Sequence, residues 1–392
     1  MRLLQVIPSL SEKHGGTRVA SYHIFKELAK RGHEITIFTS DVDFSQEWAK
    51  TLRYHQIEIR FFKASLEKVI YNIHKQHYYI TLDLMREVPR TIKYFDIIHL
   101  HGYRTFQNII LHYYAKKCNI PYILQAHGSI PRKGKQGLKW FYDVLFGYRL
   151  LKNASKVIAL NKVEAEQYKS MGISEEKIAI IPNGIDLSEY AELPPKGVFK
   201  KKFNIPEDKK IILYLGRIHK IKGIDFLVKA YAYLIKKMNC KDTVLVIAGP
   251  DDGYLKEVQE LTNRLSVSKY VLFTGPLYGR NKLEAYVDSE FYVLPSRYET
   301  FPMTVLEAYA CGKPVIGSKV GGLRDLIVDG KTGLLINVGD VEQLAKAILF
   351  LLNNEGEIEK MGSIGRQYVK YNFSIEKVVE KLEKVYEEVV EG

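Results

Sequence analysis

Short apolar runs alternate with amphipathic stretches along this chain, and few folds accommodate such an alternation. Residues 17–32 place apolar side chains at the spacing of about 3.6 that is typical of a helix, and the stretch ends in a glycine. Apolar runs joined by helices of this kind predict a parallel β-sheet that is covered on both faces. The first series of runs occupies residues 3–8, 33–40, 95–101, 121–128, 155–161 and 177–184.

The alternation begins again after residues 185–210, an irregular stretch with three prolines and no sustained periodicity. We interpret this stretch as a linker. A chain of 392 residues is long enough for two domains that each bury a core. The sequence therefore predicts an α/β protein with two doubly wound, Rossmann-like domains. The second series of runs occupies residues 211–217, 243–250, 270–275, 291–296 and 314–319.

The ends of the strands are where such folds bind ligands, so the loops after them are the places to look for function. The run 211–217 ends in Gly216 and Arg217, and Lys220 and Lys222 follow before the next predicted helix. Several cations beside a helix start suit a diphosphate. The spacing matches neither a Walker loop nor the dinucleotide G-x-G-x-x-G pattern. A solvated basic loop is the alternative reading.

A second loop of this kind lies in SRYETFPMTVLEAYACG, residues 296–312. Glu299 falls in the predicted loop, and Glu307 falls on the first or second turn of the predicted helix. Carboxylates accept hydrogen bonds from the paired hydroxyls of a ribose or hexose, and free N–H groups at a helix start bind phosphate. Alternatively, Glu299 only complements the helix dipole and Glu307 is solvated.

These segments together resemble a known family. GRIHKIKG, followed by PSRYETFPMTVLEAYACGKPVIGSKVGGLRDLI, is similar to the retaining nucleotide-sugar glycosyltransferases of family 4, which have the GT-B fold. PSLSEKHGGTRVASYHIFKELAKRGHEITIFTS, LQAHG, IPNGID, IAGPDDGY and YNFSIEKV also resemble family segments in the same order, so the likeness covers essentially the whole chain. It implies two Rossmann-like domains facing across a cleft, residues 1–186 and 187–373. The last helix, 374–392, would cross back to the first domain.

The resemblance also implies roles for particular residues. Arg217 and Lys222 would hold the donor diphosphate and stabilise the leaving nucleotide, and Glu299 would hold the donor sugar. His127, which matches the family's active-site histidine, completes the predicted catalytic set; by itself it would more often be a core histidine. Glu307 would bind the ribose. The implied donor-binding residues are Gly15, Gly16, Asn183, Gly216, Leu277, Tyr278, Phe301, Pro302, Met303, Thr304 and Glu307.

One residue departs from the family pattern, and one motif is typical of a different glycosyltransferase fold. Pro302 occupies a position that is often glycine in the family, which removes one backbone donor from the phosphate loop. Asp41 and Asp43 form a D-x-D pair, which holds a divalent metal in the other large glycosyltransferase fold. Since Arg217 and Lys222 would do the work of that metal, we predict no metal and no cofactor. The expected co-substrate is a nucleotide sugar, with UDP-sugar favoured over GDP-sugar.

Positive charge gathers in the first half of the chain. Residues 1–186 carry 28 Lys and Arg against 17 Asp and Glu, whereas the remainder is almost balanced. Residues 131–156 combine Lys133, Lys135 and other cations with several aromatic residues, which suits an anionic membrane surface. A lysine-rich surface that only maintains solubility is the alternative. In the GT-B fold the first domain usually takes the acceptor, and we predict acceptor contacts at His101, Tyr103 and Arg104.

The sequence thus predicts a retaining, metal-independent glycosyltransferase with a glycan or lipid-linked acceptor in cell-surface glycan synthesis. The start of the chain lacks the apolar stretch of a signal peptide, and three scattered cysteines suit a reducing compartment, so we expect a cytoplasmic protein, peripheral on the membrane. A GT-B epimerase or phosphorylase is the alternative enzyme. A basic nucleic-acid-binding protein without catalysis is the alternative from another class, although we predict no nucleic-acid partner.

Overall fold

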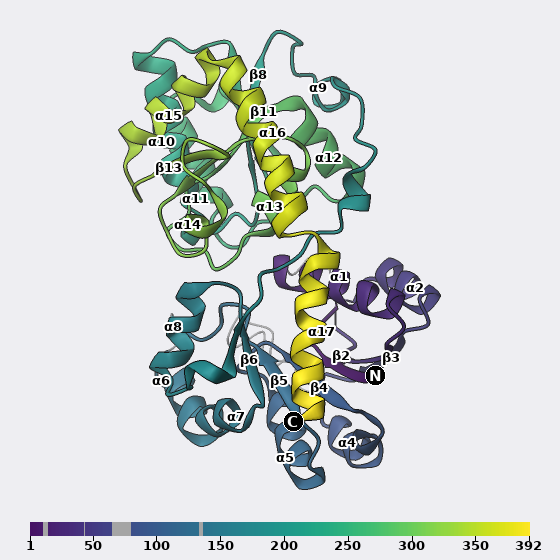
Figure 1. Ribbon diagram of the computed structural model, residues 1–392. Coiled ribbons are helices and arrows are strands. Elements are labelled where there is room, and N and C mark those ends of the chain that lie inside the picture. The colour runs from purple at the N-terminus through teal and green to yellow at the C-terminus, as the bar shows by residue number, and fades with distance from the viewer. Residues whose placement is uncertain (11–14, 43, 65–79, 133–135) are drawn as a thin grey trace. The chain divides into compact units, whose positions relative to one another are not determined.

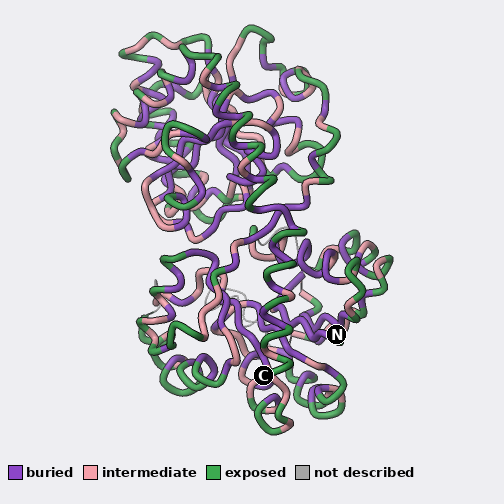
Figure 2. The backbone as a smooth tube through the Cα atoms, in the orientation of Figure 1, coloured by how far each residue is buried: buried purple, intermediate pink, exposed green. Residues whose placement is uncertain are grey.

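The computed structural model describes residues 1–10, 15–42, 44–64, 80–132 and 136–392. The chain forms two compact units (Figure 1). The first consists of Met1–Gly184 together with Ile375–Gly392, and the second consists of Ile185–Ser374. The backbone is buried mainly along the central strands of each unit (Figure 2).

The first unit contains a parallel sheet of seven strands in the order β3-β2-β1-β4-β5-β6-β7. Its central strands are buried because helices cover both faces, which is why they read as continuous apolar runs. The seven strands are β1 Arg2–Val6, β2 Glu34–Ser40, β3 Glu58–Phe62, β4 Ile97–His101, β5 Tyr122–Gln125, β6 Lys156–Ala159 and β7 Ile178–Ile180.

The last helix of the chain, α17 (Ile375–Glu391), belongs to the first unit, where it packs against α1 and β4. Its apolar residues fall on one face, from Ile375 through Val378 and Leu382 to Tyr386, and all four are buried. The predicted return of the last helix is therefore confirmed. Among the described residues of this unit, the other α-helices are α1 Gly16–Lys30, α2 Gln46–Tyr54, α4 Leu84–Thr91, α5 Phe106–Cys118, α6 Gln136–Tyr142, α7 Tyr148–Asn153 and α8 Lys162–Ser170. A π-helical turn, η3 Asp143–Gly147, lies between α6 and α7.

The second unit contains a parallel sheet of six strands in the order β10-β9-β8-β11-β12-β13. The strands are β8 Lys210–Leu215, β9 Thr243–Ala248, β10 Val271–Gly275, β11 Ser289–Leu294, β12 Val315–Ser318 and β13 Gly333–Ile336. The helices are α9 Val198–Lys202, α10 Ile224–Lys237, α11 Leu255–Arg264, α12 Gly279–Asp288, α13 Met303–Ala310, α14 Leu323–Leu326, α15 Val341–Asn353 and α16 Glu355–Asn372. Two doubly wound sheets are the predicted fold, and this prediction is confirmed.

Residues 185–210, interpreted above as a linker, are a packed part of the second unit. They form the 3-10 turn η5 (Leu187–Tyr190) and helix α9. The carboxylate of Asp288 anchors this segment by accepting hydrogen bonds from the backbone N–H groups of Gly197 and Lys200, and Phe199 is fully buried. Helices this short show no periodicity in a sequence, which explains the incorrect interpretation.

Each sheet has one point where the strand order reverses. In the first sheet this point lies between β1 and β4, and in the second it lies between β8 and β11. The loops that follow these strands must leave toward opposite sides, which opens a crevice at their carboxyl ends. The loops carrying Gly15, Arg104, Arg217 and Glu299 all follow one of these four strands. The topology therefore places the predicted loops where doubly wound sheets bind ligands.

Candidate functional site

In the second unit, the loops after β8 and β11 are joined at the reversal point. The backbone N–H of Arg297 donates to the carbonyl of Ile221 at 2.8 Å. Gly223 has a φ of 69°, and a Cβ at this position would lie 2.0 Å from the carbonyl oxygen of Pro295. Only glycine permits this close approach together with a left-handed conformation. The predicted cation loop and the predicted glutamate loop are thereby held against each other.

Lys222 and Glu299 form an ion pair across these two loops. The Nζ atom of Lys222 lies 2.6 Å from Oε1 of Glu299, and the hydroxyl of Ser296 donates to the same oxygen at 2.6 Å. The side chain of Glu299 is 7% exposed and that of Lys222 is 17% exposed. A carboxylate so deeply buried needs a cationic partner. The structure thus brings together two residues that sequence reasoning placed in the catalytic set.

Arg217 lies at the end of β8 and pairs with Asp252, which belongs to the loop after β9. Both side chains are close to half exposed. The guanidinium is therefore presented at the carboxyl end of the sheet, beside Gly216 and at the start of the loop that carries Lys222. Asp252 was not predicted, because its position in IAGPDDGY gives no sign of which cation it meets.

Glu307 lies in α13 and is held by two side chains of α12. Lys282 Nζ lies 2.8 Å from Oε1 of Glu307, and the hydroxyl of Tyr286 donates to Oε2 at 3.2 Å. Glu307 is only 5% exposed. Lys282 and Tyr286 stand four residues apart and so share one helix face. That spacing is the one signal by which the sequence could have indicated them.

The start of α13 explains how Pro302 is accommodated. Pro302 is the N-cap residue, with φ −75°, and no side chain caps the helix. At this position a missing N–H breaks no intrahelical hydrogen bond. Phe301 and Met303 are buried, and the hydroxyl of Thr304 bonds to that of Tyr292 at 2.8 Å. Pro302 has no backbone N–H, so any N–H group that the start of α13 offers to a ligand comes from a neighbouring residue.

The remaining predicted donor-binding residues fall in three other loops. Leu277 is buried and Tyr278 is partly exposed, and both lie between β10 and α12. Asn183 follows β7 and is 3% exposed. Gly15 has a φ of 91° and stands at the N-cap of α1, with Gly16 as its first residue. The structure places these residues in loops after strands or at a helix start, and their donor-binding role stays a prediction.

In the first unit, His127 follows β5 with a φ of 51°, a conformation that is uncommon for a residue with a side chain. Its Nε2 atom lies 3.0 Å from Nδ1 of His101. Burial, helped by the positive charge of Arg18, lowers the pKa of His127 to about 3. Both imidazole rings are therefore neutral near pH 7, because burial also lowers the pKa of His101.

Glu164, which sequence reasoning missed, holds the loop behind His127. Its Oε1 accepts the backbone N–H of Gly128 at 2.5 Å, and its Oε2 accepts that of Leu160 at 2.8 Å. Burial raises the pKa of Glu164 to about 7. Glu164 is the third residue of α8, after the N-cap residue Asn161. From the sequence alone, an acid at this position would be assigned only to helix capping.

The acceptor contacts predicted for the loop after β4 fall on side chains that are engaged within the protein, and their acceptor role stays a prediction. His101 is 1% exposed and Tyr103 is fully buried. Arg104 uses its guanidinium inside the protein, where it bonds to the carboxylate of Asp143 and the carbonyl of Ile130. The end of a strand in the middle of a sheet is covered from both sides, so these side chains are buried there and stabilise the loop.

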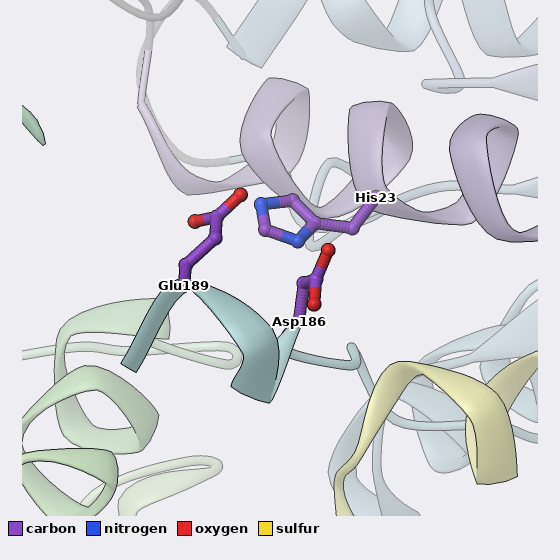
Figure 3. A group of neighbouring side chains, drawn as sticks. All are labelled: His23, Asp186 and Glu189. Atoms are coloured by element: carbon purple, nitrogen blue, oxygen red, sulfur yellow. The ribbon is translucent and has the colours of Figure 1, made fainter. Parts of the chain in front are cut away.

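The D-x-D pair is described only in part. Asp41 accepts the backbone N–H of Ala64 at 2.9 Å, whereas Asp43 lies outside the described residues, as do Lys133 and Lys135. Figure 3 shows the buried ring of His23 on α1 and the side chains of Asp186, the N-cap residue of η5, and of Glu189 within η5. His23 belongs to the first unit and the two acids to the second, so we assign no metal to them.

Comparisons with known proteins agree on one family. The sequence profile described as Glycosyltransferase Family 4 matches residues 14–189, and that described as Glycosyl transferases group 1 matches residues 196–368. Among curated proteins, N-acetyl-alpha-D-glucosaminyl L-malate synthase of Bacillus anthracis is 28% identical over 385 residues, which cover 96% of this chain and 94% of that protein.

Two solved structures show the same fold. HepE of Anabaena, solved in complex with UDP and glucose, superimposes with a TM-score of 0.80 at 19% identity, covering 98% of this chain and 99% of that one. WaaG, described as a glycosyltransferase involved in lipopolysaccharide biosynthesis, superimposes with a TM-score of 0.73 at 18% identity, covering 100% of both chains. At these identities the likeness establishes the fold rather than the substrates.

Proposed function

Because this chain belongs to the group 1 glycosyltransferases and has their GT-B fold, we propose that it moves a sugar from a nucleotide diphosphate to an acceptor hydroxyl. The main support for this proposal is that the loops after β8 and β11 are joined, with an ion pair between Lys222 and Glu299. A diphosphate requires cations and a sugar requires acceptors for its hydroxyls. These loops supply both at the carboxyl ends of two neighbouring strands.

In this proposal Arg217 and Lys222 bind the diphosphate and stabilise the negative charge that develops on the departing nucleotide. Fixed cations and the start of α13 supply this stabilisation without a metal. Glu299 accepts hydrogen bonds from the sugar and Glu307 from the ribose. We assign neither carboxylate as a covalent nucleophile, since each is already engaged by a lysine. Retention of the anomeric configuration is proposed from the family alone.

UDP is the proposed carrier of the sugar, which the UDP and glucose named for HepE support. We expect UDP and UDP-glucose to raise the melting temperature of this protein by several degrees when each is present at about a hundred times its dissociation constant. Binding to the folded state alone contributes about 2.7 kcal/mol at that ratio. A thermal-shift panel of nucleotides and nucleotide sugars, repeated with EDTA, measures both the base preference and the metal dependence.

GDP and ADP are the matched controls in this panel, because they carry the same diphosphate on a different base. A larger shift with GDP than with UDP would contradict the base assignment. Loss of every shift in EDTA would contradict metal independence. The anomeric configuration of the product, read by NMR, tests retention separately.

The acceptor is proposed to be a glycan or a lipid-linked sugar at a membrane surface. No helix among the described residues is long and apolar enough to cross a bilayer. However, α6, η3 and α7 expose a group of large apolar side chains that we call the apolar ridge. Arg149 and Lys152, both exposed, lie at its end. The ridge consists of Leu138, Trp140, Phe141, Val144, Leu145, Phe146 and Tyr148, each between 39% and 56% exposed.

Apolar side chains beside cations suit the interface of an anionic bilayer. We expect the protein to co-sediment with vesicles that contain phosphatidylglycerol, and the double variant Trp140→Asp/Phe141→Asp to bind them more than tenfold more weakly, because two exposed aromatic side chains would no longer enter the bilayer. Tyr54→Asp is the matched control, since Tyr54 is 84% exposed on α2, outside the ridge. Equal binding of both variants would contradict a membrane role for the ridge.

A small soluble acceptor is the competing assignment. The name of the Bacillus anthracis relative indicates L-malate as the acceptor of that protein. If this chain resembled it in substrate, a hydroxy acid would stimulate turnover of a nucleotide-linked N-acetylglucosamine in the absence of vesicles. Under the membrane proposal, vesicles carrying the acceptor lipid would be required instead.

A further inference from the structure

A cavity of about 460 Å³ lies in the second unit, between η5, the end of α13 and one face of α16. Small-molecule sites in proteins commonly have volumes of this size. Among the described residues, none from the loops after β8 and β11 and none of the predicted donor-binding set lines this cavity. The proposed sugar transfer therefore makes no use of it.

One wall of the cavity is a polar stripe on α16. Its members stand at positions i, i+3, i+4 and i+7, so they share one face of the helix. All of them are exposed to solvent. We call this set the α16 stripe, and it consists of Ser363, Arg366, Gln367 and Lys370.

The walls of the cavity are fixed by backbone contacts. The N–H of Ile185, just before η5, donates to the carbonyl of Phe373, just after α16, at 2.9 Å. Helix α16 also packs closely on α13 (Figure 1). A Cβ at Gly362 would lie 2.0 Å from the carbonyl oxygen of Gly312, so only glycine permits this approach. The cavity is therefore built into the fold of the second unit.

Two positive charges of the α16 stripe are left without a carboxylate. Neither Arg366 nor Lys370 forms an ion pair with a described residue, and no Asp or Glu is among the described residues that line the cavity. A phosphate monoester carries about 1.5 to 2 negative charges at pH 7, which matches two cations. Arginine and lysine, with neighbouring hydroxyl and amide donors, are groups that bind phosphate oxygens.

The opposite wall is mainly apolar. Leu187 and Tyr190 stand three residues apart in the 3-10 turn η5 and so share a face, and Ala310 at the end of α13 adjoins them in the lining. Tyr190 is only 4% exposed, yet its hydroxyl forms no hydrogen bond with a described residue. A buried hydroxyl is costly unless it finds a partner. This wall thus offers apolar surface and one donor that a ligand could engage.

We propose that this cavity binds a small organic phosphate, a monoester with an apolar or aromatic body. Its phosphate lies on Arg366 and Lys370, and its body lies against Leu187 and the ring of Tyr190. The inference does not depend on the proposed function, because it involves neither the nucleotide nor the sugar.

The first test measures the binding of phenyl phosphate to the full-length protein by calorimetry. We expect a dissociation constant of about 1 mM or lower. Inorganic phosphate and phenol, which each carry one half of the probe, should bind at least tenfold more weakly. No binding of phenyl phosphate, or equal affinity for inorganic phosphate, would overturn the inference. Benzoate that bound as tightly as phenyl phosphate would overturn the choice of a phosphate over a carboxylate.

The second test removes the two charges. The double variant Arg366→Gln/Lys370→Gln should bind phenyl phosphate more than tenfold more weakly, because the phosphate loses both of its cationic partners. Lys236→Gln/Lys237→Gln is the matched control, since it removes two exposed cations from the last turn of α10 in the same unit. Equal losses in the two variants would show an effect of net charge and overturn the site.

The third test alters the opposite wall. Tyr190→Phe should weaken phenyl phosphate about fivefold, the usual effect of one hydrogen bond, without lowering the melting temperature, because the lost hydroxyl has no partner among the described residues. Ala191→Trp should abolish binding by filling the cavity, and Ala191→Ser is its control, since Ala191 is exposed beside η5. Unchanged affinity in Ala191→Trp would overturn the inference.

The donor loops provide the last comparison. Arg217→Ala should bind phenyl phosphate as tightly as the wild type does. If Arg217→Ala lost this binding and the variant of the α16 stripe kept it, the phosphate would belong to the loop after β8 and the inference would be overturned. If UDP failed to bind, the proposed donor would be wrong, whereas the result with phenyl phosphate would still decide this site.

Discussion

Arg217→Ala should lower the rate of sugar transfer from UDP-glucose by a factor of about 100 to 1000 and weaken the binding of UDP. Removal of one fixed donor that stabilises a developing negative charge costs an enzyme about this much. Arginine also binds a diphosphate through two parallel hydrogen bonds, which alanine cannot replace. Single-turnover transfer, or release of UDP in the presence of acceptor, measures the rate, and calorimetry with UDP measures the binding.

Arg217 is a cleaner test than Lys222 for a structural reason. Removal of Lys222 would leave Glu299 buried without its ion pair, which destabilises a protein by itself. Arg217 pairs with Asp252 at a surface where both are close to half exposed, so its loss should change the stability by less than about 1 kcal/mol.

Arg264→Ala is the matched control for Arg217→Ala, since Arg264 is an exposed arginine in the last turn of α11 of the same unit. It should leave both transfer and UDP binding unchanged. Full activity of Arg217→Ala would contradict the assignment of the diphosphate to the loop after β8. Equal losses in the two variants would indicate an effect of net charge instead.

Asp143→Asn should lower the free energy of unfolding of the first unit by about 3 kcal/mol. Asp143 is fully buried and accepts hydrogen bonds from Arg104, at 2.8 and 2.9 Å, and from Arg132, at 2.7 Å. Removal of one member of a buried charge network leaves its partners uncompensated. Asp143 also ties the π-helical turn, which carries part of the apolar ridge, to the loop after β4, so the ridge should become more mobile.

Urea unfolding followed by tryptophan fluorescence measures this change, because both tryptophans of the chain, Trp48 and Trp140, lie in the first unit. Asp96→Asn is the matched control: Asp96 pairs with Arg2 at 2.7 Å in an exposed position and should cost less than about 1 kcal/mol. An equal loss of unfolding free energy in the two variants would contradict the expectation that the buried ion pairs of Asp143 stabilise the protein more than the exposed pair of Asp96.

The pH dependence of Asp143→Asn follows from the pKa of the lost carboxyl. Burial alone would raise the pKa of Asp143, but the hydrogen bonds from Arg104 and Arg132 outweigh it and hold this pKa below that of a free aspartate. The stabilisation is therefore fully present above about pH 4, the unfolded pKa, and is lost as the pH falls through the lower folded value. The stability gap between wild type and variant should be constant above about pH 5 and narrow in more acidic solution.

Much of the fold was predictable because it depends on local pattern. Apolar runs and helical spacing identified every strand of both sheets except β3 and β13, and they identified α17 as an amphipathic helix. Strand β3, Glu58–Phe62, alternates charged and apolar residues at the edge of its sheet and lacks the continuous run that marked the identified strands. Helix α9 was missed because it has less than two turns.

The candidate site was predictable only at the level of loops. The segments of Arg217, Lys222 and Glu299 could be predicted because each follows the end of a strand, and the loops after parallel strands lie at one edge of the sheet. Burial was not predictable from the same segments. His101 and Tyr103 carry the residue types of a binding loop, yet both are buried, because α1 and the segment around Asp143 cover the end of β4.

The fold class, the two doubly wound units and the loops with candidate functional residues follow from patterns in the sequence. Which charges meet depends on tertiary packing: Lys222 with Glu299, Lys282 with Glu307, and Asp143 with two arginines. Packing also joins Gln5 to Tyr386, which are 381 positions apart. Secondary structure follows from neighbours within a few residues, whereas each of these pairs depends on how whole elements pack, and packing leaves no periodic trace in a single sequence.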